Sequence, residues 1–476
     1  IENNTYVGIQ LTESNSSIIS GNKITNNELG IYVSGSSNII YGNVINGSKY
    51  NVDVDISGDV VSHLIDASNL VDGKPVYYLV NQKDLVINPQ TYPQVGYLAL
   101  INSINITVEG LTLTKNGQGV LLYNTNNSRI VNNNIINNCW GISQAHLSNN
   151  AIEGNNITNN WVGIWIYYSS YNSIVGNNIT NNDGDGIRIN NNANNNTVSG
   201  NNIANNADGG IDIRDGSSGT TVSRNNITNN GGWGLHLDMY LDGKFYHNNF
   251  INNTIQVHGY IHTSTVWDNG YPSGGNYWSD YMGVDANRDG IGDTPYVVYI
   301  LMYENVTDRY PLVAPFSMFD AGTWNGQAYS IDIISNSTLS NFKLDEAQKM
   351  LSFNVTGMEG NAGFCRITIP NIIVEDLWQG NYTVLLNGEP WPFRNWTDTA
   401  NTYIYINYTH SEHKIVIIPE FPSAIILPLF TVLTVLAVVF AKKRLPRKLK
   451  TQMKISIPLL CHKLENSKLD KFLDLS

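Results

Sequence analysis

The chain has 476 residues, of which 42% are hydrophobic and only 14% are charged, and its net charge is −12. This length exceeds one ordinary domain, and the acidic balance without a basic stripe before the extreme C-terminus argues against a nucleic-acid partner. The three cysteines lie far apart, which excludes a disulfide-rich scaffold.

The first two-thirds of the chain carries an internal repeat. A glycine followed by an aliphatic residue recurs every 22 to 24 residues from Gly119 to Gly234, and an Asn-Ile pair keeps step with it. Short segments such as Ile164-Trp165-Ile166 alternate inward and outward side chains, which indicates β-strands. Stacking such coils lets each strand pair with the next, and the asparagines of the turns can adopt left-handed backbone angles and bond to their equivalents one coil along. We therefore predict an all-β chain with a parallel β-helix over residues 1–262, interrupted by an insertion at about 51–95.

Three further segments come after the repeat. Residues 263–314 form an aromatic and acidic block that we expect to cap the last coil, and residues 315–418 alternate like the strands of a small β-sandwich stalk. Residues 423–441 are uncharged and long enough for one transmembrane helix, and the basic residues of the tail at 442–476 favour a cytoplasmic C-terminus. We expect residues 1–418 to lie outside the cell, anchored by this single membrane span. A first residue other than Met then indicates a processed chain or a fragment.

Asn-X-Ser/Thr sequons are abundant in the expected exterior and suit a glycoprotein. Those within the coils have a simpler explanation, because the turn favours Asn and the strand favours Ile and Thr. The sequons of the predicted sandwich are better evidence, and they begin at Asn336, Asn354, Asn381, Asn395 and Asn407.

The coils, the segment 72–78 and the blocks Gly275–Tyr281 and Asp289–Tyr296 together resemble the NosD-like β-helix family. The resemblance extends over roughly residues 1–314 and implies a right-handed parallel β-helix. It also implies two possible activities, because the name-giving members are periplasmic proteins linked to copper delivery, and relatives belong to carbohydrate-binding and sugar-hydrolysis domains. With the predicted membrane span, the chain looks like an archaeal cell-surface form of this family.

One outward face of the coils is the candidate ligand-binding site. The in–out–in register places its side chains in two files, with aromatic residues followed by charged ones. Aromatic rings can stack on sugars, and paired carboxylates can supply an acid and a base. Simple pairing of opposite charges between neighbouring strands explains the charged residues equally well. The candidate ligand-binding residues are Trp165, Tyr167, Arg188, Asp212, Arg214 and His236, and the candidate catalytic residues are Asp212, Asp238 and Arg188.

Two metal sites are also candidates. The first half of an EF-hand-type loop is matched by Asp285, Asn287, Asp289, Ile291 and Asp293, which predicts a structural calcium ion. Position 12 of that loop is Tyr296 rather than Glu, so a further ligand would have to come from elsewhere, such as Asp280 or Asp308. Copper is the second candidate metal, with His236, His258 and His262 as its ligands.

Three functions remain open on the sequence alone. The first is non-catalytic binding of glycans or cell-envelope proteins by an anchored surface module. The second is a polysaccharide lyase or hydrolase, and the third is a copper carrier.

Overall fold

The computed structural model describes residues 1–420 except 57–61, 241 and 300–304. The expected membrane span at 423–441 and the tail at 442–476 lie outside the described residues. Within the described part of the chain, no helix is long and apolar enough to cross a bilayer.

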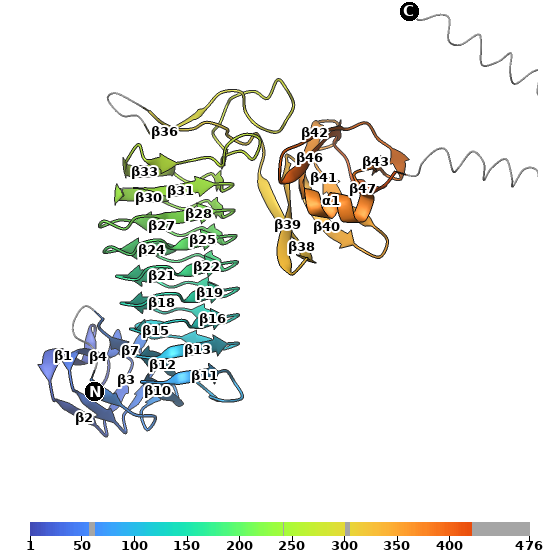
Figure 1. The fold of residues 1–476 in the computed structure, drawn as a ribbon. Helices are drawn as coiled ribbons and strands as arrows, with labels where there is room; N and C mark the ends of the chain where they lie inside the picture. The colour runs from blue at the N-terminus through green and yellow to red at the C-terminus, as the bar shows by residue number, and fades with distance from the viewer. Residues whose placement is uncertain (57–61, 241, 300–304, 421–476) are drawn as a thin grey trace, which may run out of the picture.

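The chain forms a tall parallel β-solenoid followed by two antiparallel sheets (Figure 1). Three sheets run along the solenoid, and the 12-stranded sheet, here called sheet A, carries the candidate site. Its strands, in order, are β3 (Lys23–Thr25), β6 (Val44–Asn46), β9 (Leu70–Val71), β10 (Lys74–Val80), β12 (Tyr97–Ile101), β15 (Gln118–Tyr123), β18 (Trp140–Ala145), β21 (Val162–Tyr167), β24 (Ile187–Asn190), β27 (Gly209–Ile213), β30 (Trp233–Tyr240) and β33 (Ile255–Ile261).

The other two walls contain nine and eight strands. The nine-stranded wall is β11 (Lys83–Ile87), β13 (Ile104–Glu109), β16 (Arg129–Val131), β19 (Ala151–Glu153), β22 (Ser173–Val175), β25 (Thr197–Ser199), β28 (Thr220–Ser223), β31 (Gly243–Tyr246) and β34 (Thr265–Val266). The eight-stranded wall is β14 (Thr112–Thr114), β17 (Asn134–Ile136), β20 (Asn156–Thr158), β23 (Asn178–Thr180), β26 (Asn202–Ala204), β29 (Asn226–Thr228), β32 (Asn249–Ile251) and β35 (Tyr277–Trp278).

The repeated glycine is required by close approach between coils. A Cβ atom on Gly141 would lie 2.3 Å from the carbonyl oxygen of Gly163, and one on Gly163 would lie 2.5 Å from that of Gly186. The inward aliphatic residues beside these glycines, such as Ile142 and Ile164, are fully buried. The glycine-aliphatic pair therefore sets both the spacing of the coils and the core.

Paired asparagines make the turns, and the two members of each pair have different roles. The first, as at Asn132, takes a positive φ, and the second is buried and bonds to its equivalent in the next coil. The main-chain N–H and Nδ2 of the second asparagine both donate to the next Oδ1, at 2.9 and 3.0 Å for Asn133 and Asn155. The prediction of stacked asparagine amides is confirmed. One such ladder, here called ladder 1, consists of Asn133, Asn155, Asn177, Asn201, Asn225, Asn248 and Asn276.

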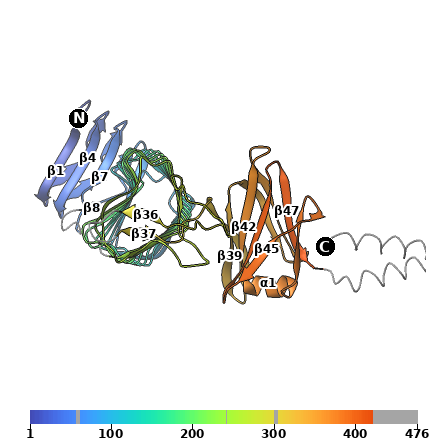
Figure 2. The same cartoon turned by 90° about the horizontal axis from the view of Figure 1, so that it is seen from above.

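The first coils form a separate block beside the N-terminal end of the solenoid (Figure 1 and Figure 2). This N-terminal block contains two three-stranded parallel sheets. The first is β1 (Val7–Asn15), β4 (Leu29–Ser36) and β7 (Tyr50–Val54), and the second is β2 (Ile18–Ser20), β5 (Ile39–Tyr41) and β8 (Leu64–Ile65). Its core includes outward side chains of sheet A, among them Tyr97 and Leu121. The block therefore covers the outer face of the lower coils.

The segment 51–95 differs from the insertion we expected. It supplies β7 through β11, and the described strands of this segment pair with the sheets. The repeat is obscured because β9 and β10 pair antiparallel, with Lys74 opposite Val71, so the chain reverses direction there. The reversal separates the N-terminal block from the taller stack.

Aromatic residues of the segment 263–314 lie over the last coil. Trp267 stacks on Phe245 at 4.5 Å, and Trp278 stacks on Phe250 at 4.5 Å, which covers the apolar end of the core. A short antiparallel pair, β36 (Tyr296–Tyr299) and β37 (Val306–Asp308), lies above it.

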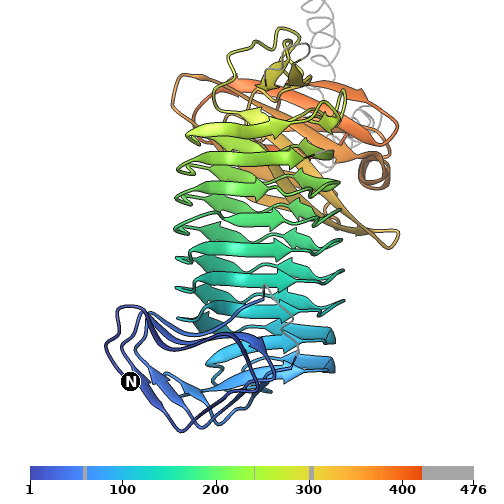
Figure 3. The ribbon, with the colours of Figure 1, turned by 90° about the vertical axis from the view of Figure 1, so that its left-hand side faces the viewer.

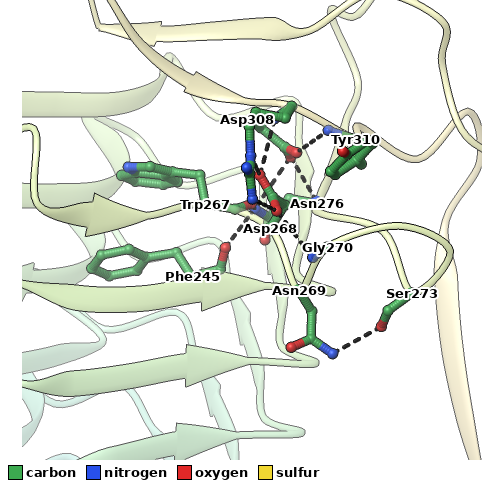
Figure 4. A network of polar contacts seen from close by, with 10 residues as sticks. Phe245, Trp267, Asp268, Asn269, Gly270, Ser273, Asn276, Asp308 and Tyr310 are labelled. Carbon is green, nitrogen blue, oxygen red and sulfur yellow. Dashed lines mark hydrogen bonds and ion pairs between the residues drawn. The ribbon is translucent and has the colours of Figure 1, made fainter. Parts of the chain in front are cut away.

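Asp308 ends ladder 1 (Figure 4). Its Oδ2 accepts the Asn276 N–H at 2.7 Å and the Trp278 Nε1–H at 2.9 Å, and its Oδ1 accepts the Tyr310 N–H at 3.1 Å. Asp308 thus occupies the place of the next asparagine oxygen, a structural role that the expectation of a calcium ligand did not foresee. Burial raises the pKa of Asp308 to about 7, although these donors oppose the shift.

The two five-stranded antiparallel sheets after the cap share one core, the arrangement of a β-sandwich. One is β38 (Phe316–Trp324), β39 (Gln327–Ser335), β42 (Ala362–Pro370), β46 (Asn401–Thr409) and β45 (Arg394–Thr397); the other is β40 (Thr338–Asp345), β41 (Met350–Thr356), β47 (His413–Pro419), β43 (Tyr382–Leu386) and β44 (Glu389–Pro390). One short helix, α1 (Asn371–Trp378), packs Ile373 and Leu377 into this core, and the described chain is otherwise built of strands, in agreement with the all-β prediction. Cys139 and Cys365 are both free.

Candidate functional site

The outer face of sheet A above the N-terminal block is the candidate site. Figure 3 views this side of the solenoid, with the N-terminal block in front of the lower coils and the upper strands uncovered. The register pairs Trp165 with Arg188, Arg188 with Asp212, and Asp212 with His236. The first predicted file of outward side chains is therefore confirmed residue by residue. Because the strands are parallel and in register, these side chains stand one coil apart on a rigid surface.

Asp212 lies at the centre of the charged part of this face. Its Oδ2 pairs with Arg214 Nη2 at 2.6 Å and with Arg188 Nε at 3.5 Å, and its Oδ1 bonds to His236 Nδ1 at 2.8 Å. The carboxylate is only 1% exposed. Pairing of charges between neighbouring strands, the simpler explanation given above, is therefore present for Arg188 and His236 with Asp212, and Arg214 bonds to the same carboxylate.

A second carboxylate, Asp185, was missed by the sequence reasoning. Arg188 donates to Asp185 Oδ2 through Nε at 2.9 Å and Nη2 at 2.6 Å, so one guanidinium joins two buried acids. Burial raises the pKa of Asp185 to about 6, with Arg188 opposing the shift. The sequence does contain a signal for this acid. In the segment Asp183-Gly-Asp-Gly, Asp185 stands directly before the repeat glycine, where most coils have an apolar or aromatic residue.

Asp238 and His258 were expected to lie side by side. The residue opposite His258 on the neighbouring strand is His236, and their rings stack at 5.3 Å, so the register does not place His258 opposite Asp238. No contact in the described structure joins Asp238 to Asp212. The candidate catalytic pair of Asp212 and Asp238 stays a prediction, whereas Asp185 is the acid that shares Arg188 with Asp212.

Aromatic rings line the lower part of the face. Trp140 stacks on Trp165 at 4.3 Å and meets Trp161 edge-on at 4.8 Å. Trp165 and Tyr167 are partly buried against the core of the N-terminal block, and the Trp165 indole donates to Asn190 at 2.8 Å. Trp161 is the more accessible ring, with 39% exposed, and the Arg188 guanidinium lies 5.5 Å from its centroid. The exposed platform is therefore Trp161 rather than Trp165.

The three histidines proposed for copper do not converge. His236 is bonded to Asp212 and stacked on His258, while His262 bonds instead to Ser264 at 2.9 Å. Among the residues that the structure describes, no group of three or more His, Cys, Asp or Glu side chains is placed to hold a metal ion.

The predicted calcium loop folds on itself through its acidic side chains. The Asp285 carboxylate accepts the N–H groups of Asp289 and Gly290 at 3.0 and 2.8 Å, and Asp293 accepts that of Ala286 at 2.8 Å. Burial raises the pKa of Asp285, and the neighbouring Asp289 adds to the shift. The oxygen donors of the loop suit calcium chemically, and the loop holds surplus negative charge that a cation would relieve. Asp280 bonds instead to the Tyr296 hydroxyl, at 3.1 Å.

Comparisons with known proteins agree with the architecture. Residues 97–256 match the family described as right-handed β-helix region, and residues 1–74 match the family described as periplasmic copper-binding protein (NosD). The chain thus carries a right-handed β-helix region and a NosD segment. A search of curated proteins finds no match.

Several solved structures resemble the chain distantly. The Dettilon tailspike protein is 11% identical, with 84% of this chain and 85% of that one covered and a TM-score of 0.32. A periplasmic alginate epimerase is 14% identical, with 51% and 76% covered and a TM-score of 0.30. A mannuronan C-5 epimerase module from Azotobacter vinelandii is 15% identical, with 51% and 68% covered and a TM-score of 0.25. Values this low support no statement about ligand or reaction.

Proposed function

We propose that the chain is a cell-surface module that binds glycans on the uncovered face of sheet A without cleaving them. The observation that carries this proposal is the placement of Trp161 beside Arg188, with Asp185 and Asp212 behind the guanidinium. An indole stacks on the apolar face of a sugar ring, and a fixed guanidinium donates to its hydroxyl or carboxylate oxygens. The parallel strands hold both groups before the ligand arrives, which reduces the ordering cost of binding.

Display at the cell surface belongs to the same proposal. Its support is the uncharged segment 423–441 followed by a basic tail, which by the positive-inside rule would leave the solenoid outside. Envelope glycans or envelope proteins would then be the nearest partners.

The proposal predicts a specific loss of glycan binding. On a glycan array, we expect Trp161→Ala in the full chain to lower the affinity for any bound glycan by about 10-fold. This is the effect of losing roughly 1.5 kcal/mol of stacking energy. Arg188→Gln should weaken acidic glycans more than neutral ones. Tyr6→Ala is the matched control, because Tyr6 is an aromatic side chain that is 81% exposed, next to β1 of the N-terminal block. Equal losses in Tyr6→Ala and Trp161→Ala would refute the site.

Catalysis is the alternative use of the same face. A carboxyl group with a pKa of about 6, as at Asp185, is suited to acid–base chemistry near neutral pH. Against it, Asp212 is engaged by three partners, which leaves no free base beside Asp185. Shortening of a bound glycan that is abolished by Asp185→Asn would establish an enzyme; intact glycan after prolonged incubation would favour binding alone.

We also propose that the loop 285–293 takes a calcium ion that stiffens the cap. Millimolar calcium should raise the melting temperature of the full chain, because a ligand that binds only the folded state stabilises it. The stabilisation is about 2.7 kcal/mol when the calcium concentration is 100 times the Kd. The rise should disappear in Asp285→Asn and persist in Asp320→Asn, a change in the β38 strand outside the loop. A melting temperature indifferent to calcium would leave the loop as a set of self-bonded turns.

A further inference from the structure

A cavity lies where the solenoid, the cap and the antiparallel sheets meet. Its volume is about 320 Å³, enough for a ligand the size of one sugar. It is lined by Arg224 of the solenoid turn after β28, His247 of the turn after β31, and Asp332 of β39. Ser273 of the cap and Thr368, Asn401 and Tyr403 of the antiparallel sheets add polar groups. The cavity is separate from the face of sheet A, so a ligand bound in it is independent of glycan binding on that face.

Nitrogen donors at this junction lack partners. The Arg224 Nη2 meets Asp332 at 3.5 Å, a long pairing, while its Nε is buried without a hydrogen bond. His247 is 5% exposed and stacks on Phe316 at 4.5 Å; its Nε2 contacts Ser273 at 3.2 Å, but its Nδ1 has no partner. Leaving the Arg224 N–H buried and unpaired costs about 1–3 kcal/mol, which an acceptor in the cavity would recover.

A buried arginine extends the same set. Arg366 is fully buried on β42, and its neighbours Thr368 and Pro370 on the same side of the strand line the cavity. Its guanidinium lies over the Tyr403 ring at 4.8 Å and donates through Nη2 to the Pro272 carbonyl. Its Nε and Nη1 have no hydrogen-bond partner. The Arg366 guanidinium also interacts electrostatically with Asp289 and Asp285 of the cap loop, so part of its charge is already balanced there.

Arg224 is the one arginine and Asp332 the one carboxylate among the lining residues of the cavity. Burial raises the pKa of Asp332, and Arg224 opposes the shift. Arg224 and Arg366 both act on His247, whose pKa burial and these two cations lower to about 3. His247 is therefore neutral, and its ring nitrogen can donate or accept according to its tautomer.

We infer that this cavity binds a small oxyanion, a carboxylate or phosphate group that accepts the unpaired N–H of Arg224. The hydroxyl and amide groups of Ser330, Thr368 and Asn401 would receive the remainder of a hydroxylated molecule such as a uronic acid. Because the lining comes from three segments, the bound anion joins the solenoid to the antiparallel sheets.

Isothermal titration of the full chain tests this inference with three probes: inorganic phosphate, glucuronate and neutral glucose. We expect phosphate or glucuronate to bind and glucose not to bind. Tighter binding of glucuronate than of phosphate would identify an acidic sugar as the ligand, and the reverse would identify a free oxyanion. Added sodium chloride should weaken binding.

Arg224→Gln is the informative variant because its side chain is 32% exposed and the fold tolerates change there better than at Arg366. We expect it to weaken anion binding at least about 10-fold, as for loss of one charged hydrogen bond. Arg129→Gln, which removes an exposed arginine paired with Glu153 on the same wall of the solenoid, should leave binding unchanged. Absence of anion binding in a folded wild-type chain, equal binding of glucose, or equal weakening in both variants would overturn the inference.

Discussion

Replacing Asp308 with alanine is expected to lower the free energy of unfolding by about 4 kcal/mol. The Asn276 N–H, the Trp278 indole and the Tyr310 N–H would all lose their acceptor in a site from which water is excluded. The aromatic cap rests on these bonds, so the last coil should open first. Urea unfolding followed by tryptophan fluorescence measures the loss, and hydrogen exchange of the final coils locates it.

Asp308→Asn separates the charge from the hydrogen bonds. One amide oxygen can still end ladder 1, so the loss should be smaller, about 1–2 kcal/mol, from the unfavourable contact of the new NH2 with the Tyr310 N–H. A folded-state pKa of about 7, raised above the ordinary value, means that Asp308 stabilises the fold at low pH and that this contribution is lost as pH rises from about 4 through 7. The wild type should show this slope in excess over Asp308→Asn. Parallel pH profiles would contradict it.

Breaking ladder 1 in mid-stack should have an effect of similar size. Asn201→Ala removes the oxygen that accepts both the N–H and the Nδ2 of Asn177, and it leaves the Ile174 carbonyl without its donor at 2.8 Å. The Asn177 N–H and the Ile174 carbonyl would lose these partners, while the Asn177 Nδ2 would keep its bonds to the Ile152 and Val175 carbonyls, so we expect a cost of about 2–4 kcal/mol. Equilibrium unfolding in urea measures the change.

The adjacent residue is the matched control. Asn202 bonds to Asn178 at 2.8 Å in a ladder on the exposed side of the turn, where water can replace the lost partner. Asn202→Ala should therefore cost less than about 1 kcal/mol. Similar losses in the two variants would mean that the amide stack, buried or exposed, contributes little beyond turn propensity.

The solenoid could be predicted because each residue of the repeat has one structural role. Gly141 and Gly163 permit close approach of coils, and Ile142 and Ile164 fill the core, so their spacing fixes the register and with it the file from Trp165 to His236. The charged cluster was correctly placed on one face for the same reason.

The other features of the fold and of the candidate site depend on contacts between residues far apart in the sequence, which the repeat does not indicate. The N-terminal block folds back over sheet A and buries Trp165 in part, because the antiparallel pair β9–β10 reverses the chain. Asp185 lies in a turn whose four-residue pattern occurs once among the coils. Arg224 and Arg366 are 142 positions apart, and only the docking of the antiparallel sheets brings their surroundings together.

Ladder 1 also has an electrical polarity. Every amide in it donates toward the following coil, from Asn133 to Asn276, so the small dipoles of the stack point the same way and reinforce one another. The positive pole of this column emerges at the C-terminal end of the solenoid, and the carboxylate of Asp308 sits upon it. This pole favours the charged form of Asp308, as the start of an α-helix favours an acid, and it therefore opposes the larger effect by which burial raises the Asp308 pKa. A lysine or arginine in place of Asp308 would leave the N–H groups bonded to this carboxylate without an acceptor. Its positive charge would also lie at the positive end of the stacked amide dipoles, which is unfavourable.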